Sequence, residues 1–290
     1  MKKSQIHPSG FALLAMLVLA GCASSPRAVS ASDSTEPAVT ASTTFDANLR
    51  NSINKNVSDI VEKYKVPGAV VGIHLAGKGD YTATIGVGNI QTKATLDAKM
   101  PWPLRSVTKS FVVTAILQLV QAGKLGLDDS IAKYTPSLPN ANTVTVRELV
   151  NMTSGLPEYT NDAFIKAYSA DPDRQFTPED LIGFAATEPA QFPPGTQHVY
   201  TNTNTVVLGK IVEMVTGLPI SQVLQQNIFG PLKLTHTVYA IDGNDWLKPH
   251  PTGYQVDNDK LVPQPNNFSI FAGAGAMIST LADLMIYAPA

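Results

Sequence analysis

Residues 105–111 read Arg-Ser-Val-Thr-Lys-Ser-Phe and place Ser106 and Lys109 three positions apart at the start of an apolar helical pattern. In a helix, side chains at i and i+3 lie on one face and can contact each other. A serine at the helix N-terminus also lies where the helix dipole favours developing negative charge. The stretch therefore predicts a serine nucleophile, Ser106, with Lys109 as its neighbouring base, the S-x-x-K arrangement of acylating enzymes.

The tetrad alone is weak evidence, because about one S-x-x-K is expected by chance in a chain of this length. The 290 residues contain three, at Ser52–Lys55, Ser106–Lys109 and 130–133. Only the second opens a long helical pattern, in which apolar residues recur every three or four positions between residues 111 and 120. Context therefore favours Ser106, and a catalytic role for the other two is a minor alternative.

The N-terminus carries two lysines, an apolar run at residues 11–20 and the sequence Leu-Ala-Gly-Cys at 19–22. The run is too short to span a bilayer as a helix. It is typical of a signal peptide (residues 1–21) that ends at a lipidated cysteine, Cys22. Cys22 is the only cysteine, so no intramolecular disulfide can form, and an incidental buried cysteine is the competing interpretation. We expect a lipid-anchored, extracytoplasmic protein on the cell membrane or outer membrane of a bacterium, since two or more acyl chains give stable anchoring.

Residues 22–44 are expected to form a flexible tether, since 17 of the 22 residues after Cys22 are Ala, Ser, Thr or Pro. The remaining part, residues 45–290, has a globular pattern. Net charge is −2 and only 15% of the residues are charged, which favours neither nucleic acid nor an anionic lipid surface as a partner.

The globular part combines helical and strand patterns. A helix is predicted over 51–64, a β-hairpin over 69–76 and 81–87, and further helices over 146–152, 162–170, 178–187, 205–216 and 220–229. Helices inserted after a hairpin predict an α/β (α+β) fold, with an antiparallel sheet domain that carries a mostly helical subdomain at about 111–235.

Several motifs, in order along the globular part, resemble the serine β-lactamase-related family of class C β-lactamases, DD-peptidases and related esterases. The S-x-x-K stretch is similar to the nucleophile motif of this family. Residues 145–157, Thr-Val-Arg-Glu-Leu-Val-Asn-Met-Thr-Ser-Gly-Leu-Pro, resemble a second conserved stretch, although Met152 stands where a histidine is usual. Phe-Pro-Pro-Gly-Thr at 192–196, followed by Tyr-Thr-Asn at 200–202, resembles the Y-x-N motif and its surroundings.

The Tyr-Thr-Asn tripeptide occurs twice, at 159–161 and 200–202. Only the later copy lies between a Pro-Pro-Gly turn and an apolar helix, so we assign it to the site. The resemblance implies that Lys109, with its pKa lowered by desolvation, or Tyr200 accepts the Ser106 proton. It also implies that Tyr200 later protonates the leaving group, and that Asn202 binds substrate and orients Lys109.

The third motif of the family, K-T-G or H-T-G, is not found. The sequence His-Pro-Thr-Gly at 250–253 is one residue too long, and it resembles a strand start that precedes the third motif. The resemblance therefore implies that the last strands of the domain, with one of two oxyanion donors, are missing. We expect residues 1–290 alone to be close to inactive.

The sequence predicts no cofactor and no metal, because the histidines share no metal-ligand spacing. The favoured function is a serine hydrolase that forms an acyl-enzyme with a β-lactam, a D-Ala-D-Ala-type peptide or an ester. The alternative is a non-catalytic penicillin- or peptidoglycan-binding protein, or an inactive remnant.

Overall fold

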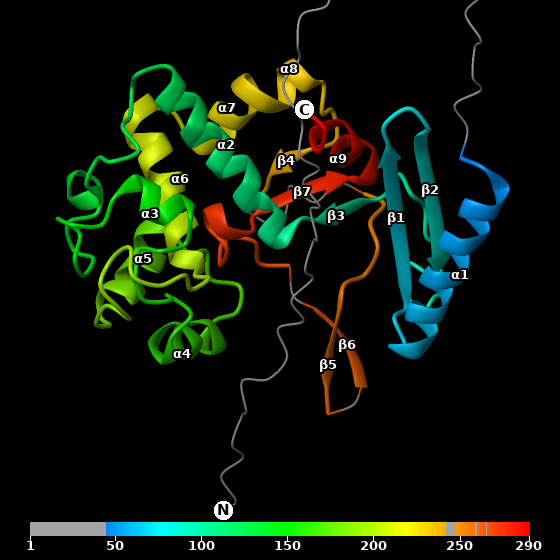
Figure 1. The fold of residues 1–290 in the computed structure, drawn as a ribbon. Coiled ribbons are helices and arrows are strands. Elements are labelled where there is room, and N and C mark those ends of the chain that lie inside the picture. The colour runs from blue at the N-terminus through cyan, green and yellow to red at the C-terminus, as the bar shows by residue number, and fades with distance from the viewer. Residues whose placement is uncertain (1–44, 242–247, 259, 265) are drawn as a thin grey trace, which may run out of the picture.

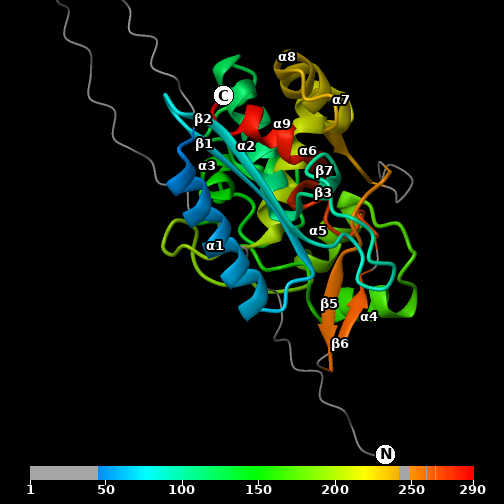
Figure 2. The same ribbon diagram turned by 90° about the vertical axis from the view of Figure 1, so that its right-hand side faces the viewer.

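The computed structural model describes residues 45–241, 248–258, 260–264 and 266–290. Figures 1 and 2 show a helical body on one side, short strands in the middle and a long hairpin with one helix on the other side. The signal peptide, Cys22 and the tether predicted from the sequence lie outside the described residues. Helices and small antiparallel sheets together confirm the expected α/β (α+β) class.

The helical body, which we define as α2 to α8, surrounds α6 (Asn202–Thr216). Its other members are α2 (Thr108–Gln121), α3 (Val146–Val150), α4 (Asp162–Ala170), α5 (Pro178–Ala186), α7 (Ile220–Leu224) and α8 (Gly230–Leu232). Because α6 packs against α2, α3, α5 and α7, nine of its 15 residues are buried. The body therefore contains most of the apolar core.

The strands among the described residues form three small antiparallel sheets. In the middle sheet, β7 (Met277–Thr280) pairs with β3 (Pro101–Pro103) on one side and β4 (Val238–Tyr239) on the other. A separate hairpin, β5 (Tyr254–Asp257) and β6 (Lys260–Pro263), extends below the middle sheet in Figure 1. The described strands thus form three separate sheets.

The hairpin layer, which we define as α1, β1 and β2, lies beside this middle sheet. In it, β1 (Gly68–Leu75) pairs with β2 (Gly79–Gly86) over eight residues each, and α1 (Ala47–Lys63) packs on β2. On the other side, α9 (Leu281–Tyr287) packs against β1. A Cβ atom on Gly72 would come within 2.7 Å of Leu281 Cδ1, so a glycine in β1 permits this close approach.

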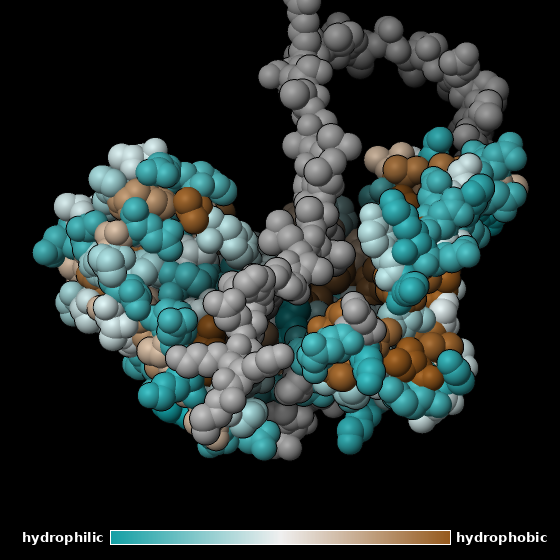
Figure 3. Space-filling view, turned by 90° about the horizontal axis from the view of Figure 1, so that it is seen from below, coloured by the Kyte–Doolittle hydropathy of each residue, from teal (hydrophilic) through white to brown (hydrophobic). Residues whose placement is uncertain are grey.

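The hairpin layer buries little of its surface. None of the residues in α1, β1 or β2 is fully buried, and Ile60 is 55% exposed. Figure 3 shows hydrophobic surface on the side of the molecule where this layer lies. Among the described strands β1 pairs only with β2, so its other edge carries no strand.

The predicted helices are present, and their ends follow local capping. The last helix of the chain begins after Thr280, whose side chain accepts a hydrogen bond from the Asp283 N–H. Helix α6 begins three residues before its predicted start, because Thr201 caps it. The segment predicted as one helix over 220–229 is α7 followed by a π-helical turn, Gln225–Phe229.

No single helix in the described part of the chain is long and apolar enough to cross a membrane. Helix α6 and the segment Ile220–Leu232 are long and apolar enough only when taken together, and they are bent by 81° relative to each other.

Candidate active site

Ser106 lies in a single 3₁₀ turn, Arg105–Val107, that leads directly into α2. Its side chain is exposed. Two contacts fix the turn. Arg105, with φ +48°, places its guanidinium carbon 4.5 Å from the centre of the Phe271 ring. The Leu104 N–H also donates to the Met277 carbonyl on β7 at 2.8 Å. The candidate nucleophile is thus presented on a fixed turn at the edge of the helical body.

Lys109 lies one turn further on and is only 7% exposed. Its Nζ donates to three oxygens: Ser106 Oγ at 3.1 Å, Asn202 Oδ1 at 2.8 Å and the Ala274 carbonyl at 2.8 Å. Burial lowers the pKa of Lys109 to about 8, because removal of water disfavours the charged amine. The amine therefore loses its proton more readily than an exposed lysine, while three acceptors fix its position.

Tyr200 reaches Ser106 from the other side. Its hydroxyl donates to Ser106 Oγ at 2.6 Å, and the Lys109 amine lies 4.8 Å from the centre of its ring. Partial burial raises the pKa of Tyr200 above its ordinary value, so the phenol stays protonated at neutral pH. Asn202 follows as the first residue of α6.

All four predicted side chains, Ser106, Lys109, Tyr200 and Asn202, therefore meet at one place. They come from segments 93 or more residues apart in sequence. The Ala274 carbonyl also belongs to this group, and no sequence motif predicted it. It belongs to a 3₁₀ turn, Ala272–Ala274, that packs tightly on α6: a Cβ on Gly273 would lie 2.3 Å from the Thr205 carbonyl oxygen. The run Gly-Ala-Gly-Ala at 273–276 was the available signal for such a close backbone approach.

Glu158 is a second group that no sequence motif predicted. Its carboxylate accepts a hydrogen bond from the backbone N–H of Asn202 at 2.7 Å. Nothing in its spacing marked it, since it simply follows the Ser-Gly-Leu-Pro stretch.

The earlier Tyr-Thr-Asn copy has a structural position. Tyr159 is 1% exposed and donates to the Ile270 carbonyl at 2.6 Å, so its hydroxyl is used inside the core. Asn161 caps α4 by accepting from the Phe164 N–H. Among the described residues, neither side chain forms a hydrogen bond with Ser106 or Lys109.

The other two S-x-x-K tetrads do not bring serine and lysine together in this way. Lys55 pairs with Asp59 on the exposed side of α1, at 2.7 Å. Ser130 donates to the Ala141 carbonyl and caps a short 3₁₀ turn.

The sequence His-Pro-Thr-Gly contacts the segment after β2. The Thr252 N–H donates to the Gly88 carbonyl at 2.8 Å, and Asn89 Nδ2 donates to Thr252 Oγ1 at 2.9 Å. These contacts agree with its interpretation as the start of strand β5.

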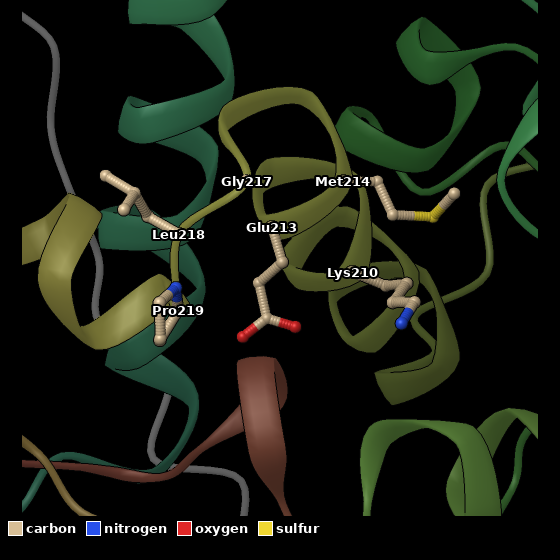
Figure 4. Close-up of a pocket in the computed structure, with 6 residues that line it drawn as sticks. All are labelled: Lys210, Glu213, Met214, Gly217, Leu218 and Pro219. Atoms are coloured by element: carbon tan, nitrogen blue, oxygen red, sulfur yellow. The ribbon is translucent and has the colours of Figure 1, made fainter.

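A hollow of about 360 Å³ lies at the opposite end of α6. Figure 4 shows Glu213 pointing into it beside Pro219, with Lys210 on the other side. Both charges have structural partners, because Glu213 accepts from the Ile220 N–H and Lys210 pairs with Glu179. The hollow therefore offers no free charge for a ligand. No three His, Cys, Asp or Glu side chains gather into a metal-binding group among the residues that the structure describes.

Comparison with known proteins supports one family. Residues 53–290 match the family model described as Beta-lactamase, so the chain belongs to the Beta-lactamase family. A protein named Beta-lactamase from Escherichia coli (strain K12) is 29% identical over 192 residues, which are 65% of this chain and 48% of that protein. The first curated relatives are covered over only 33% to 48% of their length.

Two solved structures show the same fold. A D-amino acid amidase from Ochrobactrum anthropi SV3 superposes with a TM-score of 0.72 at 28% identity, covering 83% of this chain and 69% of that one. An octameric penicillin-binding protein homologue from Pyrococcus abyssi gives a TM-score of 0.71 at 30% identity, covering 82% and 55%. The fold class and the resemblance expected from the sequence are thereby confirmed.

Proposed function

We propose that the domain at 45–290 carries the acylation centre of a serine hydrolase, with Ser106 as nucleophile. The observation that carries this proposal is the double contact at Ser106 Oγ, which both Lys109 Nζ and Tyr200 OH approach within hydrogen-bond distance. A nucleophile with a base and an acid in direct contact is the arrangement that covalent acyl transfer requires.

In the proposed reaction, Ser106 Oγ attacks the acyl carbon of the substrate while its proton passes to the neutral Lys109 amine. The bond to the leaving group then breaks, and the Tyr200 hydroxyl supplies a proton to the leaving nitrogen or oxygen. Lys109 returns the proton to Tyr200, and water hydrolyses the ester on Ser106. The sequence left Lys109 and Tyr200 open as the base. The lowered pKa of Lys109 and the raised pKa of Tyr200 favour lysine as base and tyrosine as acid.

The substrate is a carbonyl compound of one of three classes: a β-lactam, a peptide that ends in D-Ala-D-Ala, or an ester. The names of the relatives, which include a β-lactamase and a D-amino acid amidase, support this range. All three classes share the same attack on an acyl carbon.

The test is mass spectrometry of the protein after treatment with a fluorophosphonate and with a fluorescent penicillin, together with turnover of nitrocefin and p-nitrophenyl acetate. In the complete protein we expect one adduct, on the peptide that contains Ser106, and hydrolysis of at least one substrate. An adduct without turnover would favour a penicillin-binding protein instead. No adduct at Ser106 with any reagent would contradict the proposal.

We also propose that Cys22 is lipidated and anchors the protein to a membrane on the outside of the bacterial cytoplasm. The apolar run at 11–20 and the Leu-Ala-Gly-Cys sequence support this. Cys22→Ala should leave the chain unprocessed or release it to the soluble fraction. A processed, membrane-bound Cys22→Ala protein, detected by fractionation and intact mass, would contradict the anchor.

A further inference from the structure

Glu158 is a partly buried carboxylate in the loop between α3 and α4. Its Oε2 accepts from the Asn202 N–H at 2.7 Å and from Thr201 Oγ1 at 3.3 Å. Its Oε1 faces the Thr160 N–H at 3.4 Å. The shortest of these contacts is thus made to the first residue of α6, whose N–H has no acceptor within the helix.

The contact lies in a continuous chain of hydrogen bonds that ends at the nucleophile. Glu158 holds the backbone of Asn202, the Asn202 side chain accepts from Lys109 Nζ at 2.8 Å, and Lys109 donates to Ser106 Oγ at 3.1 Å. A shift of the Asn202 backbone would therefore move an acceptor of the amine that contacts Ser106.

The local cap of α6 leaves the Asn202 N–H to Glu158. The side chain of Thr201 already caps α6 by accepting from the Thr203 N–H. Helices α3 and α5 each use a residue of their own first turn, Glu148 and Asp180, to complete a capping box. In contrast, Glu158 reaches α6 from a loop 44 residues earlier in the sequence.

We propose that Glu158 is a positioning residue of the acylation centre, which fixes Asn202 against Lys109 and places a negative charge within electrostatic reach of the Lys109 amine. This inference rests on the proposed function of Ser106 and Lys109. The charge part has support from the pKa of Lys109, which burial lowers and the negative charge of Glu158 partly restores.

No other charged side chain on the described segments around α2 has been found to act on the Lys109 amine in the way proposed for Glu158. Arg105 turns away to Phe271, and the 3₁₀ turn Ala272–Ala274 and α7 bring no titratable side chain. On α6, Lys210 and Glu213 have partners at the far end of the helix. Among the described residues, the segments around α2 also bring Tyr200, which is neutral, the buried Tyr159, and Tyr287, whose ring stacks on Phe111.

Two substitutions separate the two parts of the role. Glu158→Gln keeps an oxygen that can accept from the Asn202 N–H but removes the charge. Glu158→Asp keeps the charge but shortens the side chain by one methylene, so that the carboxylate no longer reaches the Asn202 N–H. Asp180→Asn is the matched control, because it neutralises a carboxylate at the N-terminus of α5, away from Ser106.

The first measurement is the titration of Lys109 itself, by competitive labelling with trace acetic anhydride and mass spectrometry between pH 6 and 10. We expect the midpoint of Lys109 to fall by about half a pH unit in Glu158→Gln, because removal of a nearby negative charge disfavours the protonated amine. Glu158→Asp and Asp180→Asn should keep the midpoint of the unsubstituted protein. An unchanged midpoint in Glu158→Gln would overturn the electrostatic part.

The second measurement is the rate of Ser106 labelling by a fluorophosphonate over the same pH range. For each variant, the labelling rate below pH 7 is divided by the rate on the high-pH plateau of that variant. This ratio should be about threefold higher in Glu158→Gln than in the unsubstituted protein, because the Lys109 midpoint is lower. In Glu158→Asp the rate should fall about tenfold at every pH, because Asn202 is less well held. Unchanged labelling in Glu158→Asp, in a variant with normal circular dichroism, would overturn the positioning part.

These outcomes can be distinguished from failure of the proposed function. If the unsubstituted protein forms no adduct at Ser106, the proposed function fails, while the titration of Lys109 still tests the charge of Glu158. If the unsubstituted protein labels and the Glu158 variants match Asp180→Asn in both measurements, only the inference about Glu158 fails.

Discussion

The helical body and the hairpin layer are built on different amounts of burial. Helix α6 buries nine residues, whereas α1, which is longer at 17 residues, buries none. In proteins most helical stability comes from packing of an apolar face, not from intrinsic propensity. The body should therefore be rigid on its own core, while the hairpin layer depends on its few contacts with α9 and on the pairing of its two strands.

This difference matters for the site, because every side chain of the candidate centre belongs to the body or to the turns packed on it. Lys109 and Asn202 come from α2 and α6, whose mutual packing sets the distance between them. The Ala274 carbonyl comes from a turn that also packs on α6. A catalytic group placed on the best-packed elements can be held to the small tolerance that proton transfer needs.

The largest expected effect contrasts a serine of each region. Ser106→Ala should lower acylation about 10³-fold or more, since the nucleophile is lost. Ser52→Ala, in α1, should leave the rate unchanged, because Lys55 pairs with Asp59 instead. Labelling with a fluorophosphonate, followed by peptide mass spectrometry, measures both. An adduct that survives Ser106→Ala, or one found on Ser52, would show that the reactive serine has been assigned to the wrong region.

The next effect concerns the two groups that contact Ser106. Lys109→Ala and Tyr200→Phe should each slow acylation about 10²-fold, as expected when a positioned proton-transfer group is removed. Stopped-flow or quenched labelling gives the rates.

Tyr159→Phe is the matched control for Tyr200→Phe. It removes a hydroxyl that donates to the Ile270 carbonyl in the core. Acylation should change less than about threefold, whereas the free energy of unfolding should fall by about 1 to 3 kcal/mol because a buried acceptor loses its donor. If Tyr159→Phe slows acylation more than Tyr200→Phe, the assignment of the two Tyr-Thr-Asn copies is wrong.

A smaller effect is the pH dependence of the unsubstituted protein. Burial lowers the pKa of Lys109 to about 8, and the amine must be neutral to accept a proton. Below that pH the neutral fraction falls about tenfold for each unit, so acylation should rise with pH and level off above about pH 8. Tyr200 stays protonated through this window, because its pKa is raised. Rates constant from pH 6 to 9, measured by labelling of Ser106, would exclude Lys109 as the base.

Particular residues show what the sequence could predict. The helix periodicity placed α4 and α5 nearly to the residue, because regular apolar spacing and Thr or Asn caps are local signals. The order of the motifs gave the four side chains that meet at Ser106. The Ala274 carbonyl and Glu158 were missed, since backbone carbonyls and single carboxylates acquire partners only through tertiary packing. The division of the strands into three sheets also depends on long-range pairing that local patterns do not encode.

The smallest expected effect tests the comparison of the two regions directly, through hydrogen exchange. Amides of β1 and β2 should exchange through openings of lower free energy than those of α6, because no side chain of the layer is fully buried.

Leu208→Ala, at a site with 0% exposure, should lower the free energy of unfolding by about 2 to 5 kcal/mol and speed exchange throughout the body. Ile60→Ala, at 55% exposure on α1, should change it by less than about 0.5 kcal/mol. Hydrogen-exchange mass spectrometry and urea unfolding provide the two readouts. If the hairpin is as protected as α6, or if Ile60→Ala destabilises the protein as much as Leu208→Ala, then the layer is part of the same cooperative unit as the body, and the packing contrast does not govern its stability.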